Sequence, residues 1–510
     1  MTLTRVPVAI IGAGPTGITA ATLLAQYGVD TLVLDRWGDV YPQPRAVHLD
    51  DEVHRIIARL GIADEFAAIS RPAQGLRLLD TTMRVLAEFR RDTAIGGNGF
   101  PQANMFDQPE LEALLRTNLK RHSHATLRAE AEVTAIAEQG DGRVRVTYTD
   151  RTDGSEHAVD ADYVLGCDGA NSMVRSAIGT RMRDLKFEQR WLVVDVATEV
   201  ELDQWEGVHQ VCDPVRAGTY MRIGDTRYRW EFRLLPGETA EDFARLSALR
   251  PLIAPWTADA GDDELELIRV TEYTFRAQIA DSWRRGNVFL LGDAAHLTPP
   301  FIGQGMGAGL RDAMNLSWKL AGVLAGELPD HVLDTYEQER KPHTRALIRL
   351  ALTVGRSMTS GGDFGNVIRR VAVPWLHRIP GLRDKVVDST TPALRRSTMV
   401  HRSRRQWSSL TGTLCPNPLL SDGRRLDDRV GIGFTLVSTV PVTAAQREAL
   451  ERRGTSIHIA ETGTVLADWL RGGHSAAAVV RPDRTVMRAG RSLDELCSLT
   501  PTFTAHVAGS

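Results

Sequence analysis

The chain has 510 residues, 43% hydrophobic and 25% charged, which is the balance of a globular protein with two or three domains, and its net charge of −3 gives no electrostatic case for a nucleic-acid partner. Its four cysteines are widely spaced without a C-x-x-C pair, which argues against a dithiol redox centre, a disulfide framework or a metal site. No apolar run reaches about 18 residues, and the stretch before the first predicted strand is too short for a secretory signal, so we expect a cytoplasmic protein with no membrane partner.

A β-strand, a helix and a second strand are predicted at the start of the chain. Residues 6–11 form a short, largely β-branched run that is typical of a buried parallel strand. A helix follows to about residue 27, where Gly28 supplies a cap. Residues 31–35 form the second strand. This order predicts a parallel sheet with right-handed crossovers.

Helices are next predicted at residues 50–60 and 108–116. Residues 144–148 alternate in polarity and are expected to pair with residues 157–164 across a polar turn. Alternating strands then dominate from about residue 187 to residue 275. We interpret this region as an antiparallel sheet inserted between two parts of the first domain.

Helical periodicity returns at residues 308–325 and 333–354. The character of the sequence changes again beyond about residue 394. Three short strands, predicted at residues 434–438, 456–459 and 477–481, suggest a small α/β unit at the C-terminal end.

The first turn of the chain contains the pattern Gly12-x-Gly14-x-x-Gly17 between a strand and a helix. In a dinucleotide-binding fingerprint the first glycine permits a tight turn, the second lets the backbone approach a diphosphate, and the third allows close helix–strand packing. The helix N-terminus then presents free N–H groups to the phosphates. Asp35 ends the second strand, where an acid can accept hydrogen bonds from ribose hydroxyls. This motif alone does not separate FAD from NAD.

Two further glycine-rich motifs follow. One runs from Gly166 to Arg175 and contains Asp168. In the other, an apolar strand from Val288 runs into Gly292-Asp293, and the loop of residues 298–307 opens a helix. A single glycine-rich loop would be weak evidence, because many tight turns use the same residues.

Three such motifs in this order resemble the FAD-dependent aromatic hydroxylases, the single-component group A flavoprotein monooxygenases. The resemblance is closest to the 3-(3-hydroxyphenyl)propionate hydroxylases and covers nearly the whole chain. It extends to stretches outside the cofactor motifs: residues 191–195, 212–216, 230–238 and 311–319, and the motif Arg481-Pro-Asp-Arg484.

The resemblance implies an α/β fold, with a Rossmann-like FAD-binding domain, an inserted antiparallel-sheet substrate domain and a C-terminal thioredoxin-like α/β appendage. The expected FAD-binding domain has two parts, residues 1–180, with some substrate-domain strands near 75–105, and residues 278–393, with interface helices. Residues 181–277 are expected to form the substrate-binding sheet and residues 394–510 the thioredoxin-like unit. Without redox cysteines, that unit is expected to act in structure or dimerisation.

The resemblance also implies one bound FAD, NADH or NADPH as a transient co-substrate, and O2. NAD(P)H would reduce the flavin, O2 would add at its C4a atom, and the hydroperoxide would hydroxylate a phenolic ring. No second dinucleotide-binding motif is present, so we expect NAD(P)H in a groove near residues 168–175. The expected partners are a small phenol and, from the family, a second copy of the chain in a homodimer.

FAD contacts are assigned from the motifs and from the family. The acids should hold the ribose and the ribitol–diphosphate part, and the glycines of the loop should lie flat against the isoalloxazine ring. The helix behind that loop should place its positive end near the ring. The expected FAD-contacting residues are Gly12, Gly14, Pro15, Thr16, Gly17, Asp35, Arg36, Arg45, Gln108, Asp168, Gly292, Asp293, Pro300, Gly303, Gly305, Met306 and Gly307.

The residues expected to act on the substrate are His48, Tyr220, Arg222, Tyr228 and Pro300. His48 is a candidate base, because histidine titrates near neutral pH; the alternative is a packing histidine. Arg222 could pair with a substrate carboxylate or lie on a solvated face, and Arg229 has the same two alternatives. Tyr220 and Tyr228, with Trp230, could line a pocket or fill a core.

The predicted function is hydroxylation of a phenol resembling 3-hydroxyphenylpropionate or of a related small phenol, in aromatic catabolism. An alternative is a hydroxylase of a larger polyketide or antibiotic aromatic, because the same scaffold serves both. A second alternative is a flavin-binding assembly protein without catalysis. The intact glycine loop and Asp293 favour an enzyme.

Overall fold

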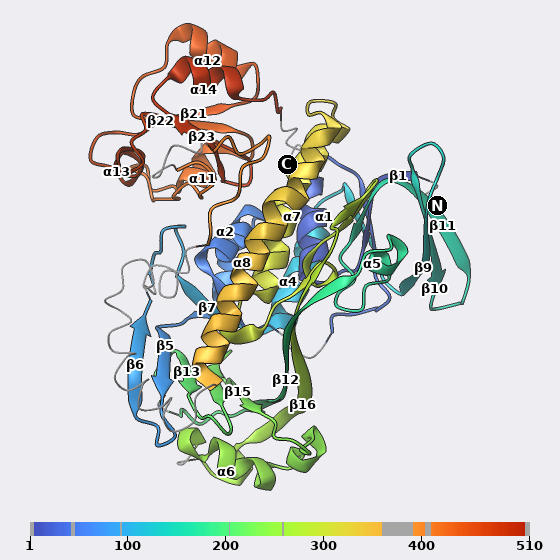
Figure 1. Ribbon diagram of the computed structural model, residues 1–510, viewed down its shortest axis with the longest axis vertical. Helices are drawn as coiled ribbons and strands as arrows, with labels where there is room; N and C mark the ends of the chain where they lie inside the picture. The colour runs from blue at the N-terminus through green and yellow to red at the C-terminus, as the bar shows by residue number, and fades with distance from the viewer. Residues whose placement is uncertain are drawn as a thin grey trace.

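A computed structural model describes residues 5–41, 46–91, 94–202, 204–257, 260–359, 391–402 and 410–504. Within these residues the strands form four sheets. A long strand pair and a small helix lie at one end of the molecule and the C-terminal unit at the other, with two long helices between them (Figure 1). No helix among the described residues is both long and apolar enough to span a membrane.

The first sheet has the strand order β17-β18-β11-β1-β2-β8, with β10 and β9 added beside β11. β1 pairs in parallel with both β2 and β11, so the predicted opening βαβ unit is confirmed. The predicted antiparallel pairing of β10 with β11 is confirmed as well. The strands are β1 (Arg5–Ile11), β2 (Thr31–Leu34), β8 (Ala125–Arg128), β9 (Ala131–Glu138), β10 (Val144–Asp150), β11 (Glu156–Gly166), β17 (Arg284–Arg285) and β18 (Val288–Leu290).

Helices pack around this sheet because its central strands are apolar on both faces. Val8, Ala9 and Ile10 of β1 are fully buried. The helices are α1 (Pro15–Gln26), α4 (Gln108–Leu119), α5 (Met173–Ala177), α7 (Gly305–Leu324) and α8 (Asp334–Thr359). The α7 helix begins three residues before the predicted start near residue 308, because Gly305, Met306 and Gly307 belong to its first turn.

A small antiparallel sheet lies beside α2 (Asp51–Arg59) and α3 (Ala63–Ala68). Its strands are β3 (His48–Asp50), β7 (Ala103–Phe106) and β4 (Ser70–Pro72). The side chain of Asp50 caps α2 by accepting a hydrogen bond from the Val53 N–H at 2.9 Å. β7 lies in the stretch near residues 75–105 that was expected to join the substrate-domain sheet, but it pairs here instead.

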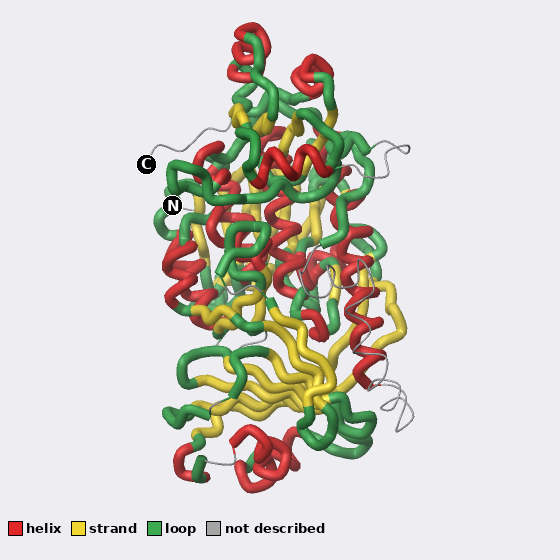
Figure 2. Tube along the Cα trace, turned by 90° about the vertical axis from the view of Figure 1, so that its left-hand side faces the viewer, coloured by secondary structure: helices red, strands yellow, loops and turns green. Residues whose placement is uncertain are grey.

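The second large sheet has the order β19-β16-β12-β15-β14-β13-β5-β6. Its strands are the layer of yellow tubes in the lower half of Figure 2. The predicted alternating strands are therefore confirmed, and β5 and β6 extend the sheet from earlier in the chain. The strands are β5 (Gly75–Leu79), β6 (Val85–Arg90), β12 (Met182–Ala197), β13 (Val208–Val211), β14 (Gly218–Arg222), β15 (Arg227–Arg233), β16 (Glu266–Ala280) and β19 (His296–Leu297).

One helix within this region was not predicted. The helix α6 (Leu246–Thr257) covers one face of the second sheet, which we call the outer face. Leu249, Ile253 and Trp256 of α6 pack there with Tyr220 and Trp230. Pro251 and Pro255 lie inside α6, which is why its sequence did not suggest a helix.

The opposite, inner face of the second sheet meets the FAD-binding part of the chain. Trp191 of β12 packs with Phe301, in the loop before α7. Met221 of β14 packs with Val47 and with Met105 of β7. Side chains on the inner face therefore lie between these two contacts.

The C-terminal unit has a four-stranded sheet with the order β21-β20-β22-β23. β20 pairs in parallel with β21 and antiparallel with β22. The three predicted strands are confirmed, and the βαβαββα order agrees with the expected thioredoxin-like appendage. The elements are α11 (Leu426–Val430), β20 (Thr435–Ser438), α12 (Ala444–Glu451), β21 (Ser456–Ile459), α13 (Val465–Gly472), β22 (Ala477–Val480), β23 (Val486–Gly490) and α14 (Leu493–Leu499).

Candidate functional site

The N-termini of α1 and α7 come together near the carboxyl end of β18. Thr16, in the first turn of α1, lies so close to α7 that a Cβ added to Gly309 would be 2.2 Å from its Oγ1. A Cβ added to Gly292, just after β18, would be 2.8 Å from the same oxygen. Neither helix has a side-chain cap or an acidic residue in its first turn. The first N–H groups of both helices thus remain for a ligand.

The three glycines of the first motif have different surroundings. Gly12 has a φ of +102°, and a Cβ there would lie 2.5 Å from the Cys167 carbonyl oxygen. A Cβ on Gly17 would lie 2.0 Å from the Gly12 carbonyl oxygen. No atom lies within 4 Å of a Cβ placed on Gly14, the N-cap of α1. Gly12 and Gly17 therefore serve the packing, whereas Gly14 leaves open space in front of the helix, followed by Pro15 in the first turn.

Asp35 lies beside this turn, just after β2. Its Oδ2 accepts a hydrogen bond from the Ala13 N–H at 2.5 Å and its Oδ1 one from the Trp37 N–H at 2.8 Å. Each carboxylate oxygen has a second lone pair, which a ribose hydroxyl can use. Arg36 is exposed, with its guanidinium carbon 5.2 Å from the centre of the Trp37 ring.

The second motif places Asp168 close to the Gly12 turn, since an added Gly12 Cβ would lie 3.1 Å from the Asp168 Cα. The carboxylate accepts hydrogen bonds from Ser172 Oγ at 2.5 Å and from the Val174 N–H at 3.1 Å. Burial raises its pKa above the ordinary value, and these hydrogen bonds oppose the rise. In this arrangement Asp168 holds the start of α5.

The third motif rests on a buried carboxylate that the sequence did not single out. Asp312 of α7 accepts hydrogen bonds from the Gly292 N–H at 3.1 Å, from His296 Nε2 at 2.7 Å and from Arg340 Nε at 2.9 Å. Burial alone would raise its pKa, but His296 and Arg340 bring the pKa below the ordinary value. Asp293 follows Gly292 in the same short turn and is half-buried. Asp312 thereby fixes the turn that presents Asp293.

A second buried network holds the loop before α7. Asp50 Oδ2 accepts hydrogen bonds from Gln304 Nε2 at 2.8 Å and from Arg311 Nη2 at 2.6 Å. Arg311 also donates to Gln304 Oε1 at 2.8 Å and lies 2.8 Å from Glu52 Oε2. These four side chains tie the loop to α2. No sequence motif marks them, because they are distant in the chain.

The loop itself combines a short turn from Pro300 with Gly303, whose φ is +62°. A Cβ added to Gly305 would have no atom closer than 3.9 Å, so the backbone there is bare. A Cβ on Gly307 would be 2.8 Å from Val53 Cγ2, and Met306 packs against the main core. At the start of α7, Gly305 thus offers the open backbone, whereas Gly307 serves the contact with α2.

Phe301 anchors the same loop on its other side. Its ring lies 6.1 Å from the Trp191 ring and 5.6 Å from the Phe187 ring, edge-on in both cases. A Cβ on Gly355 of α8 would lie 2.4 Å from Phe301 Cε2. This aromatic cluster fixes the loop against the inner face of the second sheet.

His48 lies directly beneath Gly303: a Cβ on Gly303 would be 2.6 Å from His48 Nδ1. Arg91 Nη1 lies 3.2 Å from His48 Nε2. Arginine can only donate, so Nε2 accepts and the ring proton of a neutral His48 belongs on Nδ1. Burial, together with Arg91, lowers the pKa of His48 to about 4, although Asp50 opposes this.

Gln108 is buried at the start of α4. Its Oε1 accepts a hydrogen bond from the Ala46 N–H at 2.5 Å, and its Nε2 donates to Glu112 Oε1 at 2.6 Å. It therefore holds the chain just before His48. Arg45, also expected to contact FAD, lies outside the described residues.

The aromatic residues expected near the substrate lie on the outer face instead. Tyr220 and Tyr228 are 1% and 2% exposed and pack with Trp230 in the core beneath α6. Arg222 is on the same side, with its Nη1 3.0 Å from both Glu201 Oε1 and Glu206 Oε1. The core-filling alternative fits both tyrosines, and a role for Arg222 in binding a substrate carboxylate is not favoured. Alternation along a strand groups these residues but does not say which face meets the cofactor.

The inner face carries a charged group that the motifs did not reveal. Arg229 of β15 binds Asp195 of β12 through two hydrogen bonds of 2.7 and 2.9 Å, and each residue is 1% exposed. Arg269 Nη1 of β16 lies 3.9 Å from Asp195 Oδ2. Glu231 is the next inner-face residue along β15, between the row of Met221 and the row of Trp191.

Glu231 retains accessible surface although it lies deep in the molecule. No hydrogen bond to its carboxylate is found among the described residues. Burial raises its pKa above the ordinary value and Asp195 adds to the rise, while Arg229 and Arg269 oppose it. A carboxyl group with a raised pKa in such a position can accept a proton.

Taken together, these features fit FAD. Two uncapped helix N-termini, open space at Gly14 and bare backbone at Gly305 suit a long ligand with a diphosphate and a flat ring. Asp35 lies at one end of this tract and the loop of Pro300 and Gly303 at the other. The described residues include no cluster of three His, Cys, Asp or Glu side chains placed to hold a metal ion.

Comparisons with known proteins agree with this interpretation. A family described as an FAD binding domain matches residues 5–351. A protein of Burkholderia cenocepacia (strain HI2424), named 3-(3-hydroxy-phenyl)propionate/3-hydroxycinnamic acid hydroxylase, is 34% identical over 99% of this chain and 97% of its own length. A protein of Rhodococcus jostii (strain RHA1), named probable NADH-specific resorcinol 4-hydroxylase, is 32% identical over 99% of this chain and 95% of its own length.

Solved structures extend the similarity to the whole fold. The complex of aklavinone-11 hydroxylase with FAD and aklavinone superposes with a TM-score of 0.79 at 25% identity, covering 98% of this chain and 99% of that one. The rebeccamycin biosynthetic enzyme RebC with reduced flavin gives a TM-score of 0.78 at 23% identity, which bears on the fold alone.

Proposed function

The chain belongs to the FAD-dependent aromatic hydroxylases, and on that premise we propose that it hydroxylates a small phenol with NADH or NADPH as reductant and O2 as oxidant. The observation that supports a working FAD site is the pairing of two uncapped helix N-termini with bare backbone at Gly14 and Gly305. FAD, when bound, supplies the redox chemistry: it takes a hydride from NAD(P)H and activates O2. The homodimer and the cytoplasmic location stay predictions from the sequence.

The residues proposed to hold FAD follow from this geometry. The N–H groups that begin α1, beside Gly14, Pro15 and Thr16, would face the diphosphate, and Asp35 would accept from ribose hydroxyls. Asp293 and the backbone from Pro300 to Gly305 would contact the ribitol and the ring. Asp312 and the pair Asp50–Arg311 position these segments from behind.

His48 is better suited to positioning than to proton transfer. Its Nε2 lone pair faces Arg91 and its Nδ1 carries the proton, so the neutral ring has no lone pair left for a substrate. A pKa of about 4 would also make it a weak base for a phenol. The packing alternative is therefore the one we adopt for His48.

We assign the acceptor role to Glu231. Its carboxylate lies on the inner face, between the contact of Trp191 with the Phe301 loop and the contact of Met221 with the chain beside His48. A phenol bound there can donate its hydroxyl hydrogen to this carboxylate. Partial transfer of that proton makes the ring a better nucleophile toward the oxygen donor.

The charge arrangement bears on the substrate class. Arg222 is held by Glu201 and Glu206, and Arg229 by Asp195, so both arginines considered for a substrate carboxylate already have acidic partners. This favours a phenol that bears further hydroxyl groups, as a resorcinol does, over one that bears a carboxylate. A polycyclic aromatic remains the rival, because the same fold occurs in aklavinone-11 hydroxylase.

The test is oxidation of NADH and NADPH by the purified flavoprotein, with hydroxylated product and peroxide both quantified. The panel comprises resorcinol, 3-(3-hydroxyphenyl)propionate, hydroxybenzoates and a polycyclic phenol. We expect coupled product with resorcinol-type phenols; product only with the polycyclic phenol would refute the small-phenol proposal. Failure of every phenol to stimulate oxidation would favour a protein without catalysis.

The role of Glu231 is tested separately with Glu231→Gln. We expect kcat/KM for the phenol to fall by about 10²–10⁴-fold, with the acidic limb of its pH profile lost and the FAD content unchanged. His48→Gln serves as the comparison and should keep that limb. An unaltered profile in Glu231→Gln, or loss of the limb in His48→Gln, would contradict the assignment.

A further inference from the structure

A cavity of about 60 Å³ lies between the flavin-binding part of the chain and the C-terminal unit. Arg55 and Arg59 of α2 line it on one side, and Asp427 and Arg484 of the C-terminal unit line it on the other. At roughly 10–15 Å³ for each water position, this volume holds about four to six water molecules. One tetrahedral oxyanion occupies a similar space.

Among the residues that line this cavity, arginines outnumber aspartates and glutamates. Asp427 accepts two hydrogen bonds from Arg55, at 2.6 and 2.8 Å, and its Oδ1 lies 3.0 Å from Arg484 Nε. Burial would raise the pKa of Asp427, but Arg484, Arg55 and Arg59 lower it to about 2. Three cations therefore lie around this carboxylate, and Glu52 also acts on Arg55.

The other arginines of the cavity wall have their own partners. Arg311 is matched by Asp50 and Glu52, and Arg340 by Asp312. Arg55, Arg59, Arg311 and Arg484 thus face Asp427, Asp50 and Glu52, which leaves one positive charge in excess at the cavity. The net charge of the whole chain is −3, so this excess does not reflect a generally basic protein.

Two of these arginines also keep buried N–H groups without a hydrogen-bond partner. Arg484 is 4% exposed, and its Nη1 has none, while its Nη2 donates to the Gly431 carbonyl oxygen. Arg59 Nη1 donates to Gln26 Oε1, but its Nε and Nη2 have none. A guanidinium cannot lose its proton to escape burial, so unmatched N–H groups call for an acceptor.

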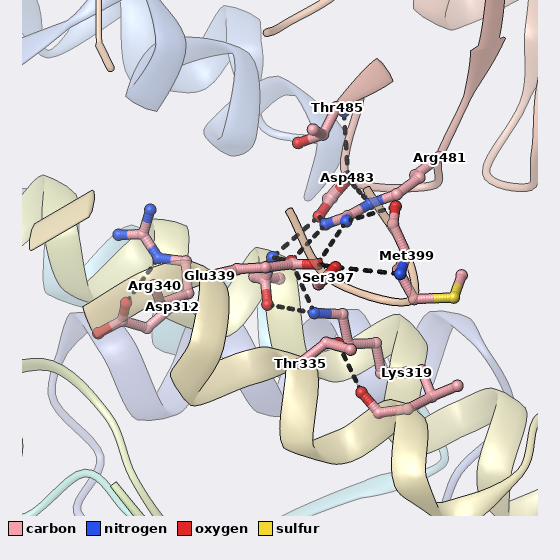
Figure 3. Close-up of polar contacts among 12 residues, drawn as sticks. Asp312, Lys319, Thr335, Glu339, Arg340, Ser397, Met399, Arg481, Asp483 and Thr485 are labelled. Carbon is pink, nitrogen blue, oxygen red and sulfur yellow. Dashed lines mark hydrogen bonds and ion pairs between the residues drawn. The ribbon is translucent and has the colours of Figure 1, made fainter. Parts of the chain in front are cut away.

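Arg484 belongs to the motif Arg481-Pro-Asp-Arg484, which the resemblance covered but the catalytic site does not use. The motif forms the turn between β22 and β23, and Arg484 has a φ of +66°, unusual for a side chain other than glycine. Arg481 and Asp483 of the same turn point toward Glu339 of α8 (Figure 3). The same short turn thus contacts α8 through Arg481 and places the Arg484 guanidinium at the cavity.

We propose that this cavity binds a small inorganic oxyanion such as phosphate, held between Arg59 of α2 and Arg484 of the C-terminal unit. The anion accepts hydrogen bonds from the unmatched N–H groups of both arginines and balances their positive charge. Because its two main contacts come from different parts of the fold, it acts as a structural ligand that stabilises the docked C-terminal unit. It takes no part in the hydroxylation.

The test uses the holoenzyme freed of phosphate and sulfate, with Tm followed as phosphate replaces chloride at constant ionic strength. We expect a saturable rise in Tm, as for any ligand that binds the folded state alone. Phosphate also stabilises proteins without binding, through exclusion from their surface, but that effect does not saturate. The variants Arg484→Met and Arg59→Met should lose the saturable part.

Arg447→Gln, an exposed position on α12, is the matched control and should keep the full phosphate effect. The two cavity variants are compared by their change in Tm on adding phosphate, so a lower starting Tm does not confuse the result. An equal, non-saturating rise in all four proteins would overturn the proposal. Crystals of the holoenzyme soaked in selenate give a direct check: an anomalous peak between Arg59 and Arg484 supports it, and a cavity that holds only water refutes it.

Discussion

Glu339 provides the sharpest test of how the C-terminal unit is held. It lies on α8 with no exposed side-chain surface and receives hydrogen bonds from Arg481, at 2.9 and 3.0 Å, and from Lys319 at 2.9 Å (Figure 3). Asn315 Nδ2 and Ser397 Oγ add hydrogen bonds at 2.9 and 2.6 Å. One carboxylate therefore joins α7, α8 and the C-terminal unit.

The substitution Glu339→Gln keeps the shape and removes the charge. The buried group then contains Arg481 and Lys319 but only Asp483 as a carboxylate, which leaves one cation unbalanced. Removing one partner of a buried ion pair costs about 3–5 kcal/mol. Since a domain is stable by about 5–15 kcal/mol, we expect the first unfolding transition in urea to move to a clearly lower concentration.

The matched control is Glu188→Gln, because Glu188 forms an exposed pair with Arg276 at 3.0 Å. Such surface pairs contribute about 0–1 kcal/mol. The double variant Glu339→Gln/Lys319→Met restores the charge balance and should lose less than the sum of the single variants. A Glu339→Gln protein as stable as the control would refute the reasoning.

The effect of Glu339 also has a defined pH dependence. Burial would raise its pKa, but Arg481 and Lys319 hold the pKa well below its ordinary value. Its contribution is therefore present above the ordinary pKa of a glutamic acid and is lost as the pH falls toward the folded-state value. The difference between wild type and Glu339→Gln should accordingly shrink in acid.

Two further predictions concern the flavin site and α2. Gly14→Ala places a methyl group in the open space before α1, so apoprotein stability should be unchanged while FAD binds about 10–100-fold more weakly, the equivalent of about 1–3 kcal/mol of overpacking. A fluorescence titration of the apoprotein measures this, and an unchanged Kd would place the diphosphate elsewhere. Burial, with Asp50 and Glu52, raises the pKa of Asp51 to about 7, so the folded state binds its proton more tightly and stability due to Asp51 falls as the pH rises from about 4 to 7. Asp51→Asn should therefore come closest to wild type in urea unfolding at about pH 4 and exceed it clearly at pH 8, whereas equal stabilities at both values would show that Asp51 titrates normally.

Local patterns were sufficient for the cofactor-binding elements. The spacing of Gly12, Gly14 and Gly17 between a strand and a helix predicted the βαβ unit, because the turn, the helix start and the contact of Gly17 with the Gly12 carbonyl oxygen all lie within six residues. The contact of Gly12 with the Cys167 carbonyl oxygen, by contrast, comes from the tertiary structure. Alternating polarity predicted the strands of the second sheet for a similar reason. The helix α6 was missed because its two internal prolines argue against a helix when neighbours are unknown.

The sequence alone could not predict which face of the second sheet meets the flavin site. Alternation places Tyr220, Tyr228 and Trp230 on one face and Arg229 and Glu231 on the other, but residues on both faces are buried, so burial does not tell the faces apart. Only the packing of α6 on one side and of the Phe301 loop on the other distinguishes them. We therefore assign the role of proton acceptor to Glu231 rather than to His48.

What the sequence by itself determined is the family, the cofactor and the positions of most strands along the chain, since these depend on short motifs and on periodicity. What only the tertiary structure decided is how distant charges meet: Asp50 with Arg311, and Glu339 with Arg481 across 142 positions. Ion pairs of this kind leave no periodic trace in the chain, because their partners are chosen by the packing of whole elements. The same packing brings Arg59 and Arg484 to one cavity.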